Sequence, residues 1–270
     1  MTEDISTYKG VRIDDTAEWR LVIYVSDTSM SAHLKNLENP LEQIVTLFEE
    51  QWQRDESSLL RHIETTVYDH PQLMDDFSTE IVVCSPKSMW APEALISDYE
   101  DESEMYNKVY RADEGDIMSD VHNGMCCLYS LVPGLAAFLR RTLSGARVSC
   151  HQTVLARRFM SRGSDMPRIY VDIRDGAVDF IVLDDRRMLL AATHEWHDKM
   201  DIAYHIFNIM DVYGLDRDNT QVSLSGIREV KQDLLKLLRE HLSYVMLTMM
   251  PSAVSKVEMP IAAAIALARS

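Results

Sequence analysis

Several residues around one predicted turn have side chains that can take part in phosphate or metal chemistry. Asp172 and Asp175 flank Arg174, and Gly176 follows. Carboxylates placed in this way can hold Mg²⁺ through water beside a substrate phosphate, and a guanidinium can bind phosphate through two donors. The structural alternative is that an Asp-Gly pair simply forms a tight turn and that Asp172 faces solvent. We favour this alternative, because turn chemistry explains the pattern without a ligand.

A second group of candidate ligands lies further along the chain, where His194 and His197 flank Glu195 and Trp196, and Asp198 follows. Two histidines three residues apart do not match the HExxH pattern, in which the histidines share a helix face and bind zinc. An aspartate directly before an apolar helical pattern is typical of a helix N-cap. We therefore interpret this segment as a loop that leads into a helix, and we assign no metal ligands and no catalytic residues.

The first candidate turn joins two runs of alternating apolar residues, which predict an antiparallel hairpin over 168–183. A weaker version of this pattern occupies 20–34. With an offset of 148 positions, Asp27 falls on Asp175. Two similar hairpins, one near the start of each half, indicate two related lobes. We place these lobes at 1–160 and 161–270.

The rest of the chain alternates between β-like and helical patterns. In the first half we expect a helix over 40–54, short strands over 62–68 and 80–84, a helix over 86–97, an acidic connector over 98–116, a hairpin over 117–131 and a helix over 133–143. In the second half we expect a strand over 187–193, a helix that Asp198 caps and Gly214 ends, a strand over 220–225, a helix from Gly226 to Leu242, a strand near 244–249 or 254–258, and a closing helix. The order is roughly βββ-α-β-α in each half, which predicts an α/β protein with mixed sheets.

Composition limits the classes of partner. The net charge of −16 disfavours nucleic acid and the anionic surface of a membrane. The apolar run at 261–267 is much shorter than the roughly 20 residues that a bilayer-spanning helix needs, and the acidic, polar start does not resemble a secretory signal. We therefore expect a cytoplasmic protein without membrane insertion, with its four cysteines reduced in the core.

The chain resembles the actin-like ATPase superfamily in its order of elements, its repeated hairpin pattern and its alanine-rich end. This superfamily includes actin, Hsp70 chaperones, sugar kinases and, more distantly, the pilus-assembly ATPase PilM. More closely, the chain resembles uncharacterised bacterial proteins with an actin-like ATPase fold. The segments that carry the resemblance are 116–139, 190–214 and 221–226. The resemblance implies an actin-like ATPase (ribonuclease H-like) fold with a nucleotide held by loops of both lobes.

The resemblance also assigns candidate nucleotide-binding residues: Asp27, Thr28, Asp172, Asp175, Gly176, Ser225 and Gly226. Each of the three loops departs from the family pattern. The first phosphate loop has no glycine, and the second phosphate loop and the adenosine motif each have one where glycine-rich sequences are usual. Backbone amides approach phosphate closely only where side chains are absent, so these loops predict weak or lost nucleotide binding.

We therefore expect a non-catalytic or weakly nucleotide-binding protein that acts as a binding or scaffolding module. Its partner is expected to be another protein, and a homodimer remains open. The alternative is an active Mg²⁺-dependent ATPase or phosphotransferase, which would use ATP and Mg²⁺ at Asp172 and Asp175. No cofactor is assigned with certainty.

Overall fold

The computed structural model describes residues 6–8, 11–39, 44–96, 102–110, 115–250, 254 and 257–268. The chain divides into two compact units. Unit 1 comprises residues 1–85, 91–151 and 250–270, and unit 2 comprises 86–90 and 152–249. The predicted lobes differ from these units chiefly at the end of the chain, because residues 250–270 belong to unit 1.

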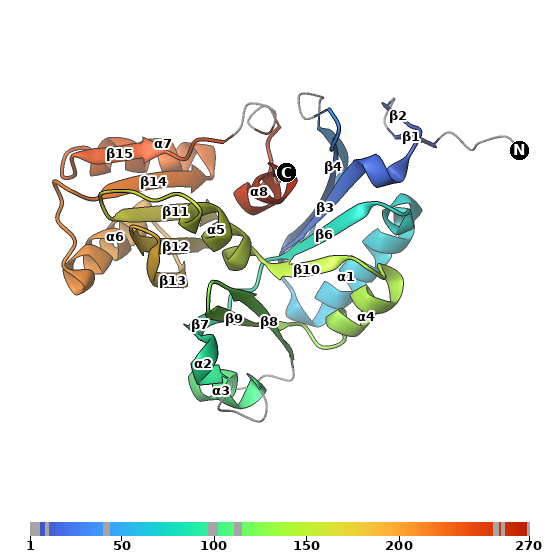
Figure 1. Ribbon diagram of the computed structural model, residues 1–270, viewed down its shortest axis with the longest axis horizontal. Coiled ribbons are helices and arrows are strands. Elements are labelled where there is room, and N and C mark those ends of the chain that lie inside the picture. Colours follow the sequence, from blue (N-terminus) through green and yellow to red (C-terminus); the bar gives the residue numbers. More distant parts are fainter. Residues whose placement is uncertain are drawn as a thin grey trace, which may run out of the picture. The chain divides into compact units, whose positions relative to one another are not determined.

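Unit 1 is built on a five-stranded mixed sheet in the order β10-β6-β3-β4-β5 (Figure 1). Its strands are β3 (Trp19–Val25), β4 (Ser29–Asn36), β5 (Val45–Gln51), β6 (Ser78–Val83) and β10 (Arg147–Cys150). β3, β4 and β5 form an antiparallel meander, whereas β6 runs parallel to both β3 and β10. The first hairpin therefore lies in the middle of the sheet.

Unit 2 repeats this arrangement with the order β13-β12-β11-β14-β15. Its strands are β11 (Arg168–Arg174), β12 (Ala177–Asp184), β13 (Arg187–Glu195), β14 (Gln221–Gly226) and β15 (Tyr244–Leu247). The first three strands are again antiparallel, and β14 runs parallel to β11 and β15. The two sheets therefore share one topology, as the predicted duplication requires.

The registers of the two central hairpins agree with the 148-residue offset seen in the sequence. Arg20 lies opposite Lys35 in unit 1, and Arg168 lies opposite Leu183 in unit 2. At the turns, Val25 lies opposite Met30 and Ile173 lies opposite Val178. The echo between the two sequence segments thus corresponds to equivalent strand pairs.

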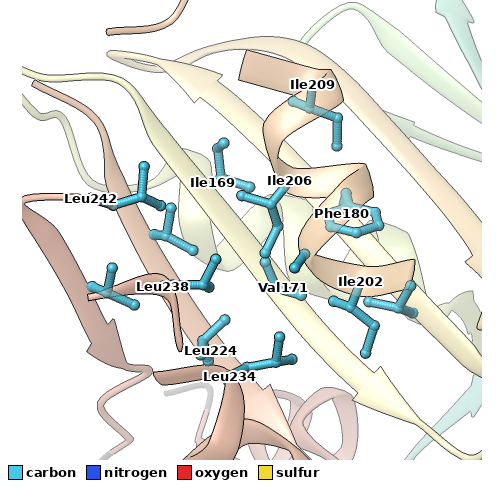
Figure 2. Packing of buried hydrophobic residues seen from close by; sticks show 14 of the residues in the cluster. Ile169, Val171, Phe180, Ile202, Ile206, Ile209, Leu224, Leu234, Leu238 and Leu242 are labelled. Carbon is cyan, nitrogen blue, oxygen red and sulfur yellow. The ribbon is translucent and has the colours of Figure 1, made fainter. Parts of the chain in front are cut away.

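Two helices cover one face of the unit 2 sheet. In α6 (Lys199–Tyr213), Ile202, Ile206 and Ile209 are spaced by three or four residues and pack against the central hairpin with α7 (Arg228–Leu238) (Figure 2). Asp198 and Asp201 form a capping box at the start of α6, and Gly214 ends it in the left-handed conformation. The predicted boundaries of this helix are confirmed.

Unit 1 uses helices from distant parts of the chain. They are α1 (Glu56–Asp69), α4 (Leu135–Thr142) and the C-terminal α8 (Ile261–Ala268), which packs against β3, β4 and β6. Between β6 and β10 the chain also forms β7 (Ser88–Pro92), α2 (Glu93–Ile96), α3 (Glu102–Val109), and the hairpin of β8 (Asp116–His122) and β9 (Met125–Leu131). The order β7-β9-β8 forms a small third sheet, and β1 (Ser6–Tyr8) and β2 (Val11–Ile13) form a two-stranded one. The remaining helix, α5 (His151–Met160), follows β10.

Three predictions of a local helix or strand differ from the structure. The predicted helix over 40–54 is strand β5 from Val45 onward, because pairing with β4 outweighs the local helical spacing; residues 40–43 lie outside the described part. The predicted strand over 62–68 is part of α1, whose buried Leu59, Ile63 and Val67 recur every four residues. The predicted helix over 86–97 is mostly β7 and the short α2.

The acidic segment over 98–116 is more than a connector. Residues 98–101 and 111–114 lie outside the described part, but α3 occupies Glu102–Val109 between them. Tyr106 is buried and its ring lies 5.1 Å from that of Tyr110. An aromatic anchor within the acidic run therefore orders this helix.

Candidate functional site

In unit 1, the turn between β3 and β4 satisfies its own polar groups. The amide of Ser26 donates to the carbonyl of Ser29 at 2.8 Å, and their hydroxyls lie 2.8 Å apart. The amide of Thr28 donates to the Ser26 hydroxyl at 3.3 Å. Amides that already donate within the turn are poorly placed to bind a phosphate.

The predicted ligand residue Asp27 in this turn also has a protein partner. Its carboxylate forms an ion pair of 2.6 Å with Nε of Arg54. Its backbone carbonyl accepts a hydrogen bond of 2.9 Å from the indole Nε1 of Trp52, and the Trp52 amide donates to the Thr28 carbonyl at 2.9 Å. Trp52 thus holds two successive carbonyls of the turn.

In unit 2, the turn between β11 and β12 is held in the same way. Gly176 adopts a positive φ of 66°, which the tight turn requires. The indole Nε1 of Trp196 lies 2.9 Å from the Arg174 carbonyl and 3.1 Å from the Ala177 carbonyl. The backbone amide of Trp196 donates to the Gly176 carbonyl at 3.3 Å. Asp175, at the tip of this turn, is exposed.

We call these two contacts the tryptophan clamps: Trp52 on the turn of residues 26–29, and Trp196 on the turn of residues 174–177. In both units the tryptophan is the first residue after the third strand, β5 or β13. The carbonyls that accept from the two tryptophan amides belong to Thr28 and Gly176, which are related by the 148-residue offset. The clamps were not predicted, although a tryptophan at the end of each third strand was the signal for them.

Two of the predicted site residues meet in the unit 2 sheet. Asp172 on β11 lies opposite Ser225 on β14, and the Ser225 hydroxyl lies 3.0 Å from Oδ1 of Asp172. The same hydroxyl lies 3.0 Å from the Val171 carbonyl. Asp172 is buried, so the expectation that it faces solvent is wrong. A buried carboxylate that accepts from a neighbouring hydroxyl is suited to structural or ligand-binding roles.

Gly226 has a backbone explanation. Its φ is +91°, and a Cβ at this position would lie 1.9 Å from the Ile173 carbonyl oxygen. The amide of Ile227 donates to that oxygen at 2.9 Å. Close approach of β11 and β14 therefore requires glycine here, whether or not a nucleotide binds.

A buried polar network lies beside Asp172 and was missed by the sequence analysis. Asp179 on β12 lies opposite Asp172, and its carboxylate contacts Nε of Arg174 at 2.7 Å and Oγ1 of Thr193 at 2.5 Å. Thr193 in turn accepts from Nε2 of Gln152 at 2.8 Å. Because Asp179 is neutralised by a guanidinium and hydrogen-bonded on both oxygens, it is poorly placed to act as a general base.

The histidines near β13 have structural partners. His194 stacks on His205 with ring centroids 4.3 Å apart, and burial followed by the nearby His205 lowers its pKa. The backbone amides of His197 and Asp198 donate to the Asp201 carboxylate, which lowers the pKa of Asp201. Among the described residues, no three or more His, Cys, Asp and Glu side chains are grouped so that they could hold a metal ion.

Within the described part of the chain, no helix is long and apolar enough to cross a membrane. All four cysteines are free and buried.

The fold resembles that of several solved structures. A protein with an actin-like ATPase fold and unknown function from Bacteroides thetaiotaomicron matches with a TM-score of 0.80 and 18% identity, over 94% of this chain and 97% of that one. A PilM–PilN type IV pilus biogenesis complex matches with a TM-score of 0.58 and 12% identity, over 94% of this chain and 98% of the matched chain. The predicted actin-like ATPase fold is thereby confirmed.

At the level of sequence, no curated protein matches the chain. One family does, over residues 9–245, and it is described as "Protein of unknown function (DUF3822)". Because this match spans most of the chain, the protein is a member of the DUF3822 family.

Proposed function

We propose that this protein uses an actin-like fold to bind a protein partner and that it binds nucleotide weakly or not at all. The observation that carries the proposal is the pair of tryptophan clamps. Each turn that the resemblance assigns to phosphate has its carbonyls held by an indole and an amide of the same unit. A loop held in this way cannot easily rearrange its backbone around an anion.

Two further observations support the proposal. In the first turn, the charge that would meet a phosphate is the carboxylate of Asp27, which is paired with Arg54. One of the solved structures that match this chain contains PilM together with a second protein, PilN. A member of this fold can therefore form a complex with a protein, although fold alone does not determine function.

Thermal unfolding with millimolar ATP or ADP, with and without Mg²⁺, tests the proposal. A ligand at about ten times its dissociation constant stabilises the native state by about 1.4 kcal/mol, so useful binding would raise the midpoint clearly. We expect no Mg²⁺-dependent rise. A rise that disappears in Asp172→Asn would contradict the proposal, because this variant keeps the size of the side chain and removes its charge.

The second candidate function is a Mg²⁺-dependent ATPase or phosphotransferase. It is favoured by one observation, the buried contact between Asp172 and Ser225. ATP hydrolysis above the buffer rate that is lost in Asp172→Asn, with unchanged unfolding of the free protein, would establish it over the first proposal.

A further inference from the structure

Unit 1 contains a cleft that the nucleotide turns do not use. It has a volume of about 530 Å³ and lies between the end of β5 and the helix α1. This size falls within the range of roughly 300–1,000 Å³ that is usual for ligand sites. One wall is formed by Glu50, Gln51 and Trp52, and the other by side chains of α1 and by His70.

The helix wall is a continuous polar face of α1. Ser58, Arg61, His62, Thr65 and Asp69 recur every one to four residues and all line the cleft. The buried, apolar face of the same helix carries Leu59, Ile63 and Val67 instead. The cleft is therefore lined by groups that can form hydrogen bonds.

The opposite wall is the edge of a sheet. β5 is the last strand in the order β10-β6-β3-β4-β5 and pairs with β4 on one side. Its last three residues, Glu49, Glu50 and Gln51, are exposed. An edge strand offers backbone amides and carbonyls to a further strand, which would lie about 4.8 Å away.

The charges beside this edge are mainly negative. Glu50 on the strand and Asp69 at the end of α1 line the cleft with one lysine or arginine, Arg61. The neighbouring Glu49 is exposed, and the whole chain carries −16. An occupant with lysine or arginine side chains would complement these carboxylates, whereas an occupant with acidic side chains would be repelled.

We propose that an extended, basic segment of a partner protein binds in this cleft as an added strand on β5. This inference rests on the proposed function, since it names the surface and the chemistry of the partner. The polar face of α1 spans about 17 Å from Ser58 to Asp69, which accommodates about five residues of an extended chain. Main-chain pairing with β5 supplies affinity, and the carboxylates select basic side chains.

The cleft also adjoins the first tryptophan clamp. The ring of Trp52 lies parallel to that of His62, with centroids 5.4 Å apart, and both residues line the cleft. The indole nitrogen of Trp52 meanwhile holds the Asp27 carbonyl. A bound segment would therefore touch the side chain that holds the turn.

The test uses labelled peptides of about ten residues that alternate lysine with valine, and a matched set that alternates glutamate with valine. Binding to the full-length protein is followed by fluorescence anisotropy. We expect the lysine peptide to bind and the glutamate peptide not to bind. The charge-reversed variant Glu50→Lys/Asp69→Lys should lose about tenfold in affinity for the lysine peptide and gain affinity for the glutamate peptide. A control variant, Asp211→Lys/Glu240→Lys, changes the net charge by the same amount at exposed positions of unit 2. It should leave the affinities for both peptides nearly unchanged.

A second arm tests strand addition. Peptides that are N-methylated at alternate residues lose the hydrogen-bond donors of one edge, so methylation of one edge should abolish binding and methylation of the other should not. Amide exchange of Val45–Gln51 should slow in the complex. Equal loss of lysine-peptide affinity in both charge variants, or indifference to N-methylation, would overturn the proposal and indicate non-specific binding to an acidic surface. If the peptides fail these tests and nucleotide does not stabilise the protein, the cleft is not the binding site, but the proposed protein-binding function still stands. If nucleotide does stabilise the protein, the proposed function itself is contradicted.

Discussion

At the scale of single residues, Gly226 shows how a nucleotide motif and a backbone requirement can be confused. A Cβ at Gly226 would collide with the Ile173 carbonyl, whereas one at Gly214, which also has a positive φ, meets nothing within 4 Å. We expect Gly226→Ala to lower the free energy of unfolding by about 3 kcal/mol or more, and Gly214→Ala by only about 1 kcal/mol. Urea unfolding of both variants measures the difference, and equal losses would show that the sheet adapts to the added methyl group.

His33 gives the unit 1 sheet a dependence on pH. Burial lowers its pKa to about 4, and its ring nitrogens lie 3.1 Å from the hydroxyls of Thr46 and Ser31. In the unfolded chain this histidine binds its proton near pH 6.5. The contribution of neutral His33 to the free energy of unfolding is therefore complete above that pH and is lost as the pH falls toward 4, by up to about 3 kcal/mol.

We expect His33→Gln to be less stable at pH 8 and to have a flatter profile between pH 7 and 4. Urea unfolding across this range tests it. A wild-type slope that persists unchanged in His33→Gln would assign the pH dependence to other groups.

Residue types, together with the family resemblance, predicted two residues of the candidate site. Asp172 and Ser225 were both assigned, and the structure brings them to 3.0 Å. The partner of Arg174, Asp179, was not predicted. Asp179 lies within an apolar strand pattern, and it reaches Arg174 only because β12 folds back on β11. Pairing across strands cannot be read from a single segment.

At the scale of elements, prediction succeeded where local signals agree with the tertiary structure. The helix α6 has its capping box, its apolar stripe and its terminal glycine within one short segment, so its limits follow from the sequence. β5 is the contrary case. Its apolar residues fit helical spacing, but β4 provides a paired edge, and the pairing decides the conformation.

The tryptophan clamps are also features of elements, since each joins the end of a third strand to the turn of a central hairpin. Replacing either indole by phenylalanine keeps the ring and removes the Nε1 donor. We expect Trp52→Phe and Trp196→Phe each to cost about 1–2 kcal/mol, because the carbonyls lose a partner. Amide exchange should quicken in the clamped hairpin alone, β3–β4 in the first variant and β11–β12 in the second.

The two units thus serve as controls for each other. Faster exchange in both hairpins of either single variant would mean that the indoles act through general stability and not through their own turns.

At the scale of the whole molecule, the duplication was predictable because it rests on repeated local patterns. Period-2 alternation survives in both central hairpins, and the sheets that grow from them have the same strand order. The place of the last helix was not predictable. Its alanine-rich sequence indicates burial, but a sequence that is apolar on all sides does not show which sheet buries it.

The stability of unit 1 depends on this last helix, α8. Residues Ile261–Leu267 of α8 are all buried, and the helix packs on β3 and β4. Lys35 donates to the Leu267 carbonyl at 3.2 Å, and Arg20 contacts the Ala266 carbonyl at 3.5 Å. Deleting 261–270 would expose the apolar face of these strands and leave two cations without their helix-end acceptors.

We expect this deletion to remove on the order of 5 kcal/mol or more, comparable with the whole stability of many domains. Hydrogen exchange should then show loss of protection in β3, β4 and β6, while the hairpin β11–β12 of unit 2 stays protected. Deleting only residues 269–270, beyond the helix, should leave both patterns unchanged. Uniform loss of protection in both units would instead mean that they unfold as one cooperative body and that α8 stabilises the molecule as a whole.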